Sequence, residues 1–125
     1  MKIKLNDPPR KFKVGRNGSI EISDCGTISL EPEEQITFVT KTGSQYDVAK
    51  KSWGYYAAPS LNGRLLEFGL RPALVTNKST GRFFILLVER NKDQEFEKYL
   101  ADETLTLVFW LHDPLVLEKI AAVET

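Results

Sequence analysis

The chain has 125 residues, of which 42% are hydrophobic and 27% are charged. This length fits one domain with a hydrophobic core of its own. The 17 basic and 17 acidic side chains cancel, which argues against a dedicated nucleic-acid-binding protein, because phosphate contacts require surplus positive charge. A neutral chain also has little net repulsion between copies, so association into a homodimer is permitted.

The sequence contains few groups of the kinds that usually carry chemistry. Cys25 is the only cysteine, which excludes a disulfide within the chain and suits a reducing compartment. His112 is the only histidine, and no metal-ligand, nucleophile-elbow or phosphate-loop motif is present. No segment has the apolar length of a signal peptide or a membrane-spanning helix. We therefore expect a cytoplasmic protein outside the membrane, with no metal, no cofactor and no assignable catalytic residue.

The basic residues gather at the N-terminus, where residues 1–18 contain six lysines and arginines and a single acid. This pattern predicts a partly extended basic arm with one short strand near residues 11–14. We expect a single β-rich domain over residues 19–113, followed by a C-terminal tail or short helix over residues 114–125.

Alternating apolar residues predict three hairpins. The first spans residues 20–30 and would turn at Asp24-Cys25-Gly26. The second joins residues 35–41 to residues 45–50, and the third joins 70–77 to 82–89. Because residues 83–88 are apolar on both faces, we expect residues 82–89, the second strand of the third hairpin, to be a central strand that is covered on both sides. Residues 105–111 predict a further buried strand.

Helical spacing is clearest over residues 91–102, with Asn91 as the expected N-cap. Residues 61–68 predict about two helical turns, with Ser60 as cap and Gly69 as the C-terminal stop. The fold class expected is therefore β-rich α+β. It would have about seven mostly antiparallel strands, in a barrel or a sandwich, with one clear helix near 91–102 and one or two short helices.

The loop over residues 53–65 is the strongest candidate for a binding site. It concentrates aromatic rings, which stack on sugars, bases or prolines, beside an amide and a guanidinium at a helix start. We expect arginines from the following strands to converge on it and hold an anion. The predicted ligand-binding residues are Trp53, Tyr55, Tyr56, Ser60, Asn62, Arg64, Arg71 and Arg82. In the alternative interpretation, the three aromatics fill the end of the core and Arg64 pairs with Glu67.

Three segments of the sequence carry a resemblance to a known set of proteins. They are Glu34-Gln35-Ile36-Thr37-Phe38-Val39-Thr40, then Tyr46-Asp47-Val48 leading into residues 53–65, and Gly81-Arg82-Phe83-Phe84-Ile85-Leu86-Leu87-Val88-Glu89. Together they resemble small uncharacterised bacterial proteins that accompany nucleotide-sugar and surface-polysaccharide genes. The resemblance covers residues 18–111 and brings no catalytic residues. It implies cytoplasmic work beside the making or modification of surface sugars.

Three hypotheses for function follow. The first is a non-catalytic binding or accessory module for a nucleotide-sugar, a glycan precursor or a partner enzyme of that pathway. The second is a small enzyme acting on a sugar or sugar nucleotide, with Tyr55, Tyr56, Asn62 and Arg64 in contact with the substrate. The third is a purely structural protein-interaction domain, with the loop as its contact surface.

Overall fold

The computed structural model describes residues 1–123. These residues form eight strands in three antiparallel sheets, together with three helices, which confirms the β-rich α+β class. The chain divides into two compact units. The first contains residues 1–36 and 48–56, and the second contains residues 37–47 and those from 57 onward. The predicted domain boundaries, after residues 18 and 113, stay a prediction.

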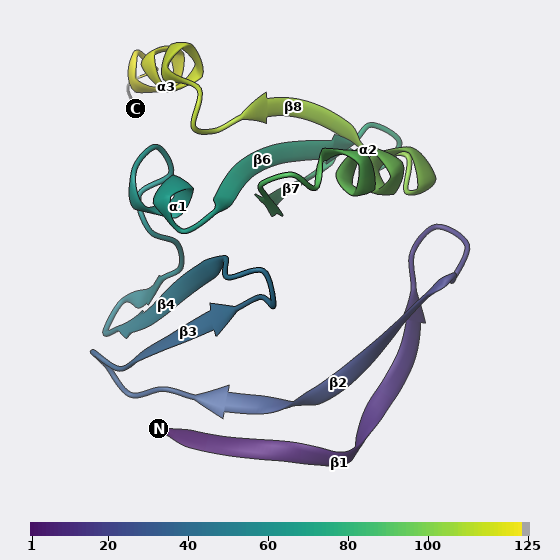
Figure 1. Cartoon of the computed structure of the whole chain (residues 1–125), viewed down its shortest axis with the longest axis vertical. Coiled ribbons are helices and arrows are strands. Elements are labelled where there is room, and N and C mark those ends of the chain that lie inside the picture. Colours follow the sequence, from purple (N-terminus) through teal and green to yellow (C-terminus); the bar gives the residue numbers. More distant parts are fainter. Residues whose placement is uncertain (124–125) are drawn as a thin grey trace. The chain divides into compact units, whose positions relative to one another are not determined.

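The first unit is built on a long two-stranded ribbon. Strands β1 (Lys2–Val14) and β2 (Ile20–Ser29) pair antiparallel, and Figure 1 shows them as a twisted hairpin. Residues 2–14 therefore form one long strand where the sequence predicted a short strand near residues 11–14. Alternation places isoleucine, leucine, valine and phenylalanine on one face of the ribbon and the lysines of β1 on the other.

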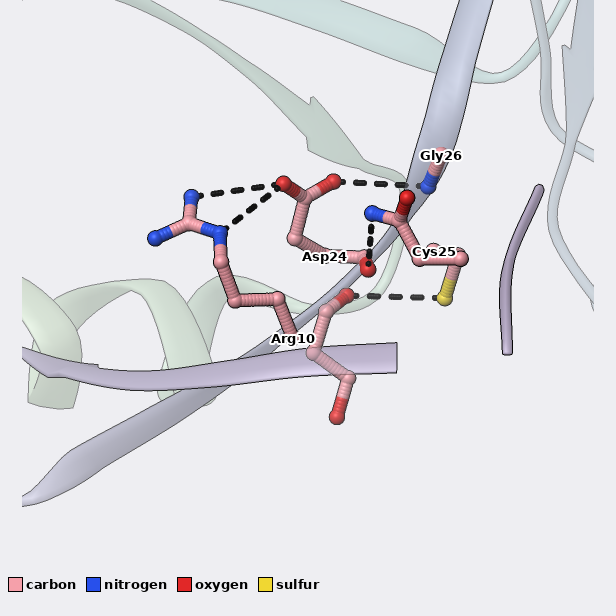
Figure 2. Close-up of polar contacts among 6 residues, drawn as sticks. Arg10, Asp24, Cys25 and Gly26 are labelled. Carbon is pink, nitrogen blue, oxygen red and sulfur yellow. Dashed lines mark hydrogen bonds and ion pairs between the residues drawn. The ribbon is translucent and has the colours of Figure 1, made fainter. Parts of the chain in front are cut away.

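The predicted hairpin turn at Asp24-Cys25-Gly26 is wrong, because β2 runs straight through these residues. They lie instead opposite a bulge, where the register shifts between Leu5 and Arg10. Figure 2 shows the Asp24 carboxylate accepting hydrogen bonds from the Arg10 guanidinium, at 3.3 and 3.4 Å, and from the Gly26 N–H, at 3.3 Å. Turn-forming residue types are thus used here to hold a bulge.

A second sheet has the strand order β3-β4-β5. Its strands are β3 (Gln35–Val39), β4 (Gln45–Lys51) and the three-residue β5 (Gly54–Tyr56). The predicted second hairpin is confirmed by the first two strands. The division between the two units passes through β3 and β4, so each of these strands contributes residues to both units.

The second unit is built on the sheet β7-β6-β8, with β6 (Leu70–Asn77) in the centre. Strand β7 (Arg82–Glu89) pairs with β6 over its whole length, as predicted for the third hairpin, and β8 (Thr106–Trp110) pairs with the other side of β6. The expectation that residues 82–89 form a central strand covered on both sides is wrong. Strand β7 is an edge strand, and the side chains of residues 83–85 are exposed.

Three helices complete the second unit. Helix α1 (Arg64–Glu67) is shorter than predicted, and the chain leaves it at Gly69, which has a φ of +90°. Helix α2 (Asp93–Asp102) starts after Lys92, so Asn91 is not its cap; Asn91 has a φ of +62°. Helix α3 (Pro114–Ala121) is capped by Asp113, whose side chain accepts a hydrogen bond from the Leu115 N–H at 2.9 Å.

One face of the sheet in the second unit carries the core. Ala73, Val75 and Val88 are buried there, and Phe96 and Leu100 of α2 pack against them. Figure 1 shows α2 beside these strands. No helix in residues 1–123 is long and apolar enough to span a membrane.

Candidate binding site

The strongest concentration of polar and aromatic groups in the second unit lies where β6 begins and β8 ends. Because the two strands are antiparallel, Arg71 at the start of β6 comes close to Trp110 at the end of β8. His112 and Asp113 follow in the turn that leads to α3. We call Arg71, Trp110, His112 and Asp113 the Arg71 cluster.

Arg71 is held in place by three groups. Its Nη2 atom donates a hydrogen bond to the Glu89 carbonyl oxygen at 3.2 Å and forms an ion pair with the Asp93 carboxylate. Its guanidinium carbon lies 4.7 Å from the centre of the Trp110 ring. This is a cation–π contact, and it holds the guanidinium over the indole.

Trp110 is the shared wall of the cluster. Its ring lies 5.8 Å from the Phe96 ring, at an interplanar angle of 54°. The His112 ring meets it edge-on, with centres 5.6 Å apart and an angle of 69°. The indole is therefore packed by three neighbours, which orients it, and it remains partly exposed.

Two cavities adjoin the cluster. One, of about 400 Å³, is open to solvent and is lined by Arg71, Trp110, His112, Asp113 and Pro114. The other, of about 190 Å³, is lined by Arg71 and Trp110 together with side chains of α2 and Leu107. The larger one falls within the size range of small-molecule sites, roughly 300–1,000 Å³.

Two buried nitrogen atoms of the cluster have no hydrogen-bond partner among residues 1–123. They are Nε of Arg71 and Nδ1 of His112. An arginine Nε always carries a hydrogen and can only donate. A buried donor left unpaired costs about 1–3 kcal/mol, so such atoms call for an explanation. An acceptor group in the adjoining cavity would supply one.

His112 is expected to be neutral at pH 7. Burial lowers the pKa of its imidazole below the ordinary 6.5, the positive charge of Arg71 lowers this pKa further, and Asp113 opposes both effects. Because the folded pKa lies below the unfolded one, the unfolded chain takes up the proton first on acidification. The stability that neutral His112 contributes is therefore complete above about pH 6.5 and is lost as the pH falls toward the folded pKa.

NMR titration tests this assignment directly, because His112 provides the only imidazole signal of the chain. We expect a folded pKa below 6.5 and a rise toward 6.5 in Arg71→Gln, which removes the nearby charge. Arg82→Gln, a charge change at an exposed position in the same unit, serves as the control and should leave the pKa unchanged. A pKa at or above 6.5, or one unmoved in Arg71→Gln, would contradict the assignment.

The aromatic residues of the predicted loop lie in the first unit. Trp53, Tyr55 and Tyr56 are 73%, 55% and 47% exposed, so they do not fill a core. Tyr55 and Tyr56 belong to β5, where they pair with Lys50 and Ala49 of β4. The Lys50 Nζ atom lies 5.5 Å from the centre of the Tyr55 ring. The three aromatics are thus exposed, with Tyr55 and Tyr56 on opposite faces of a small strand and Trp53 just before it.

The polar residues of the predicted loop lie in the second unit, around the start of α1. The Ser60 hydroxyl accepts a hydrogen bond from the Arg64 N–H at 2.7 Å, so it caps this turn from four residues away although Gly63 is the formal N-cap. Asn62 is exposed. Arg64 forms an ion pair with the buried Asp47, at 3.0 Å, and lies over the Phe68 ring rather than pairing with Glu67.

The two predicted arginines of the later strands form other contacts. Arg82 is exposed at the start of β7, and its register partner is Asn77. Arg71 is the one predicted site residue that belongs to the Arg71 cluster. Its neighbours Trp110, His112 and Asp113 were not predicted, because only the pairing of β6 with β8 brings them together.

Another cavity, of about 480 Å³, lies between the turn after β3, the end of α1 and the turn after β7. Its polar groups already serve one another. The Arg90 guanidinium donates to the carbonyls of Leu66 and Glu67, and the Ser44 hydroxyl donates to the carbonyl of Gly69. These hydrogen bonds give Arg90 and Ser44 a structural role within the protein. The Arg71 cluster is therefore the better candidate for a ligand-binding site.

Comparisons with protein-family models, with curated proteins and with solved structures find no match to this chain. Within residues 1–123, no three histidine, cysteine or acidic side chains gather in a way that could hold a metal ion. The function proposed below is therefore inferred from the geometry of the Arg71 cluster.

Proposed function

We propose that the protein is a non-catalytic binding module and that a sugar-containing ligand, such as a nucleotide-sugar or a glycan precursor, binds at the Arg71 cluster. The observation that carries this proposal is the pair of unpaired buried nitrogens, Arg71 Nε and His112 Nδ1, in residues that line one open cavity. Arg71 Nε can only donate, so it favours a ligand with a hydrogen-bond acceptor, whereas Nδ1 of a neutral His112 can donate or accept.

The chemistry of the cluster suits a sugar. Arg71 can only donate hydrogen bonds, and the Asp113 carboxylate can only accept them, with capacity beyond its one bond to the Leu115 N–H. A sugar presents neighbouring hydroxyl groups that both donate and accept, so it can satisfy both side chains at once. The partly exposed Trp110 adds an aromatic wall of the kind on which sugar rings rest.

A thermal-shift screen with nucleotide-sugars and free monosaccharides tests the proposal. A ligand that binds only the folded protein stabilises it by about 2.7 kcal/mol when its concentration is 100 times Kd. For a domain of this size, that corresponds to a rise in Tm of roughly 5–15 °C. We expect such a rise for at least one nucleotide-sugar, and we expect Arg71→Gln and His112→Gln to reduce it.

Two matched variants separate this site from the one predicted from the sequence. Arg82→Gln removes an exposed arginine outside the cluster, and Trp53→Ala removes the most exposed aromatic of the loop. Both should keep the full ligand-induced shift. Loss of the shift in Trp53→Ala alone would return the site to the loop. Absence of any shift across the screen would refute the proposal, and turnover of a bound ligand would replace it with the enzymatic alternative.

A further inference from the structure

Strand β7 is an unprotected edge of its sheet. It pairs with β6 over eight residues without a register shift, and in the described residues no strand pairs with its outer side. From Phe83 to Val88 it carries neither charge nor proline. The opposite edge strand, β8, is shorter and pairs with β6 through a register shift. Bulges, charges and short lengths are the usual protections of an edge, and β7 has none of them between its end residues Arg82 and Glu89.

The sheet face that α2 leaves uncovered is apolar next to this edge. Phe83 and Ile85 of β7 are each 61% exposed, and Phe109 of β8 is 44% exposed. Register places Ile85, Leu74 and Phe109 in one row across the three strands. Exposed apolar side chains therefore accompany unpaired backbone groups along β7, a combination that marks an interaction surface.

We infer that β7 pairs antiparallel with β7 of a second copy of this chain, with Ile85 opposite Ile85. The two three-stranded sheets then form one sheet of six strands. A two-fold axis perpendicular to the sheet leaves each face of the joined sheet on the same side in both copies. A residue can therefore pair only with a residue whose side chain points to the same face. The row Phe109, Leu74 and Ile85 then continues through the axis into the same row of the second copy.

Charge selects this register among the allowed ones. With Ile85 at the axis, Phe83 faces Leu87 and Phe84 faces Leu86 of the second copy, and no like charges meet. A shift that puts Leu86 at the axis would place Arg82 opposite Arg90, twice. Like charges directly opposite one another are destabilising.

The shift in the other direction is disfavoured by length. With Phe84 at the axis, only residues 82–86 of β7 pair, whereas the Ile85 register pairs residues 82–88 within the strand. The Ile85 register is therefore the longest one free of opposed arginines. The zero net charge of the chain adds no long-range repulsion between copies.

Sedimentation of the full chain, between roughly 10 μM and 500 μM, tests the inference. We expect a monomer–dimer equilibrium that Ile85→Lys shifts at least about tenfold toward monomer. Phe109→Lys is the matched control, because it adds the same charge to the same face at the opposite edge of the sheet, away from β7. It should leave dimerisation unchanged. Circular dichroism confirms that both variants remain folded, as expected at exposed positions.

Three results would overturn the inference: a monomer at every concentration, a dimer insensitive to Ile85→Lys, or equal disruption by Phe109→Lys, which would indicate packing through the sheet face.

Cysteine cross-linking checks the register in a Cys25→Ser background. Opposed residues of an antiparallel pair have Cα atoms about 4.5–5.5 Å apart, within disulfide range. Ile85→Cys should therefore cross-link. Phe83→Cys should not, because two copies of residue 83 would lie roughly 13 Å apart. The reverse pattern would contradict this register.

Discussion

Replacing Gly26 with alanine is expected to disrupt the β1–β2 ribbon and to destabilise the first unit by about 3 kcal/mol or more. Gly26 has a φ of +152°, and a Cβ built on it would lie 2.2 Å from the Lys4 carbonyl oxygen and 3.0 Å from the Leu5 Cα. These are backbone atoms of the neighbouring strand, so no side-chain rotation relieves the clash. The two strands must separate or the bulge must rearrange.

Gly18→Ala is the matched control for this substitution. Gly18 lies in the turn of the same ribbon and also has a positive φ, +62°, but nothing lies within 4 Å of its added Cβ. Gly18→Ala should lower the stability of the first unit only by the conformational penalty of about 1 kcal/mol. Amide hydrogen exchange of β1 and β2 measures both effects, and equal protection in Gly26→Ala and Gly18→Ala would contradict the role of the close approach.

The second large effect is expected for Leu65→Ala, which should destabilise the second unit by about 2–5 kcal/mol. Leu65 has no exposed surface and is among the largest fully buried side chains. It lies in α1, whose four residues provide too few hydrogen bonds to hold the helix by themselves, so packing must supply the stability. Removing the side chain leaves a cavity beneath the turn that carries Arg64.

Urea unfolding measures this loss, and Leu66→Ala, one residue away and only partly buried, is the control with a smaller expected effect. The two tryptophans help to locate the change, because Trp53 belongs to the first unit and Trp110 to the second. The Trp110 indole N–H signal should report the transition of the second unit. A loss below about 1 kcal/mol in Leu65→Ala would contradict the assignment of Leu65 to the core.

Elements whose pattern is formed by residues close together in the sequence were predictable from it. The β6–β7 hairpin follows from alternation, and α2 (Asp93–Asp102) lies within the helix that helical spacing predicted over residues 91–102. The errors arose where the same local signal serves two structures. Asp24-Cys25-Gly26 has turn chemistry, yet it faces a bulge, and an apolar run such as residues 83–88 is typical of a central strand, yet it forms an edge.

The Arg71 cluster was only partly predictable for a related reason. Sequence chemistry singled out Arg71, but its neighbours come from the pairing of β6 with β8, which are separated along the chain by β7 and α2. The same holds for Arg64, whose ion pair with Asp47 joins α1 to a distant strand. No local pattern encodes which strands will pair. The site was therefore predicted at the loop over residues 53–65, whose composition is unusual, and not at the junction of β6 and β8 that positions Arg71.

The division between the two units has a consequence for how the chain can be made and cut. The chain crosses that division three times, after residues 36, 47 and 56. Residues 37–47 therefore leave the ribosome early but belong to a unit completed only by later sequence. A fragment that starts at residue 57 lacks Asp47, the partner of Arg64, and Thr40 and Thr42, whose hydroxyls bind the Glu89 carboxylate. Separate production of the second unit thus requires a linker that joins residue 47 to residue 57 in place of residues 48–56.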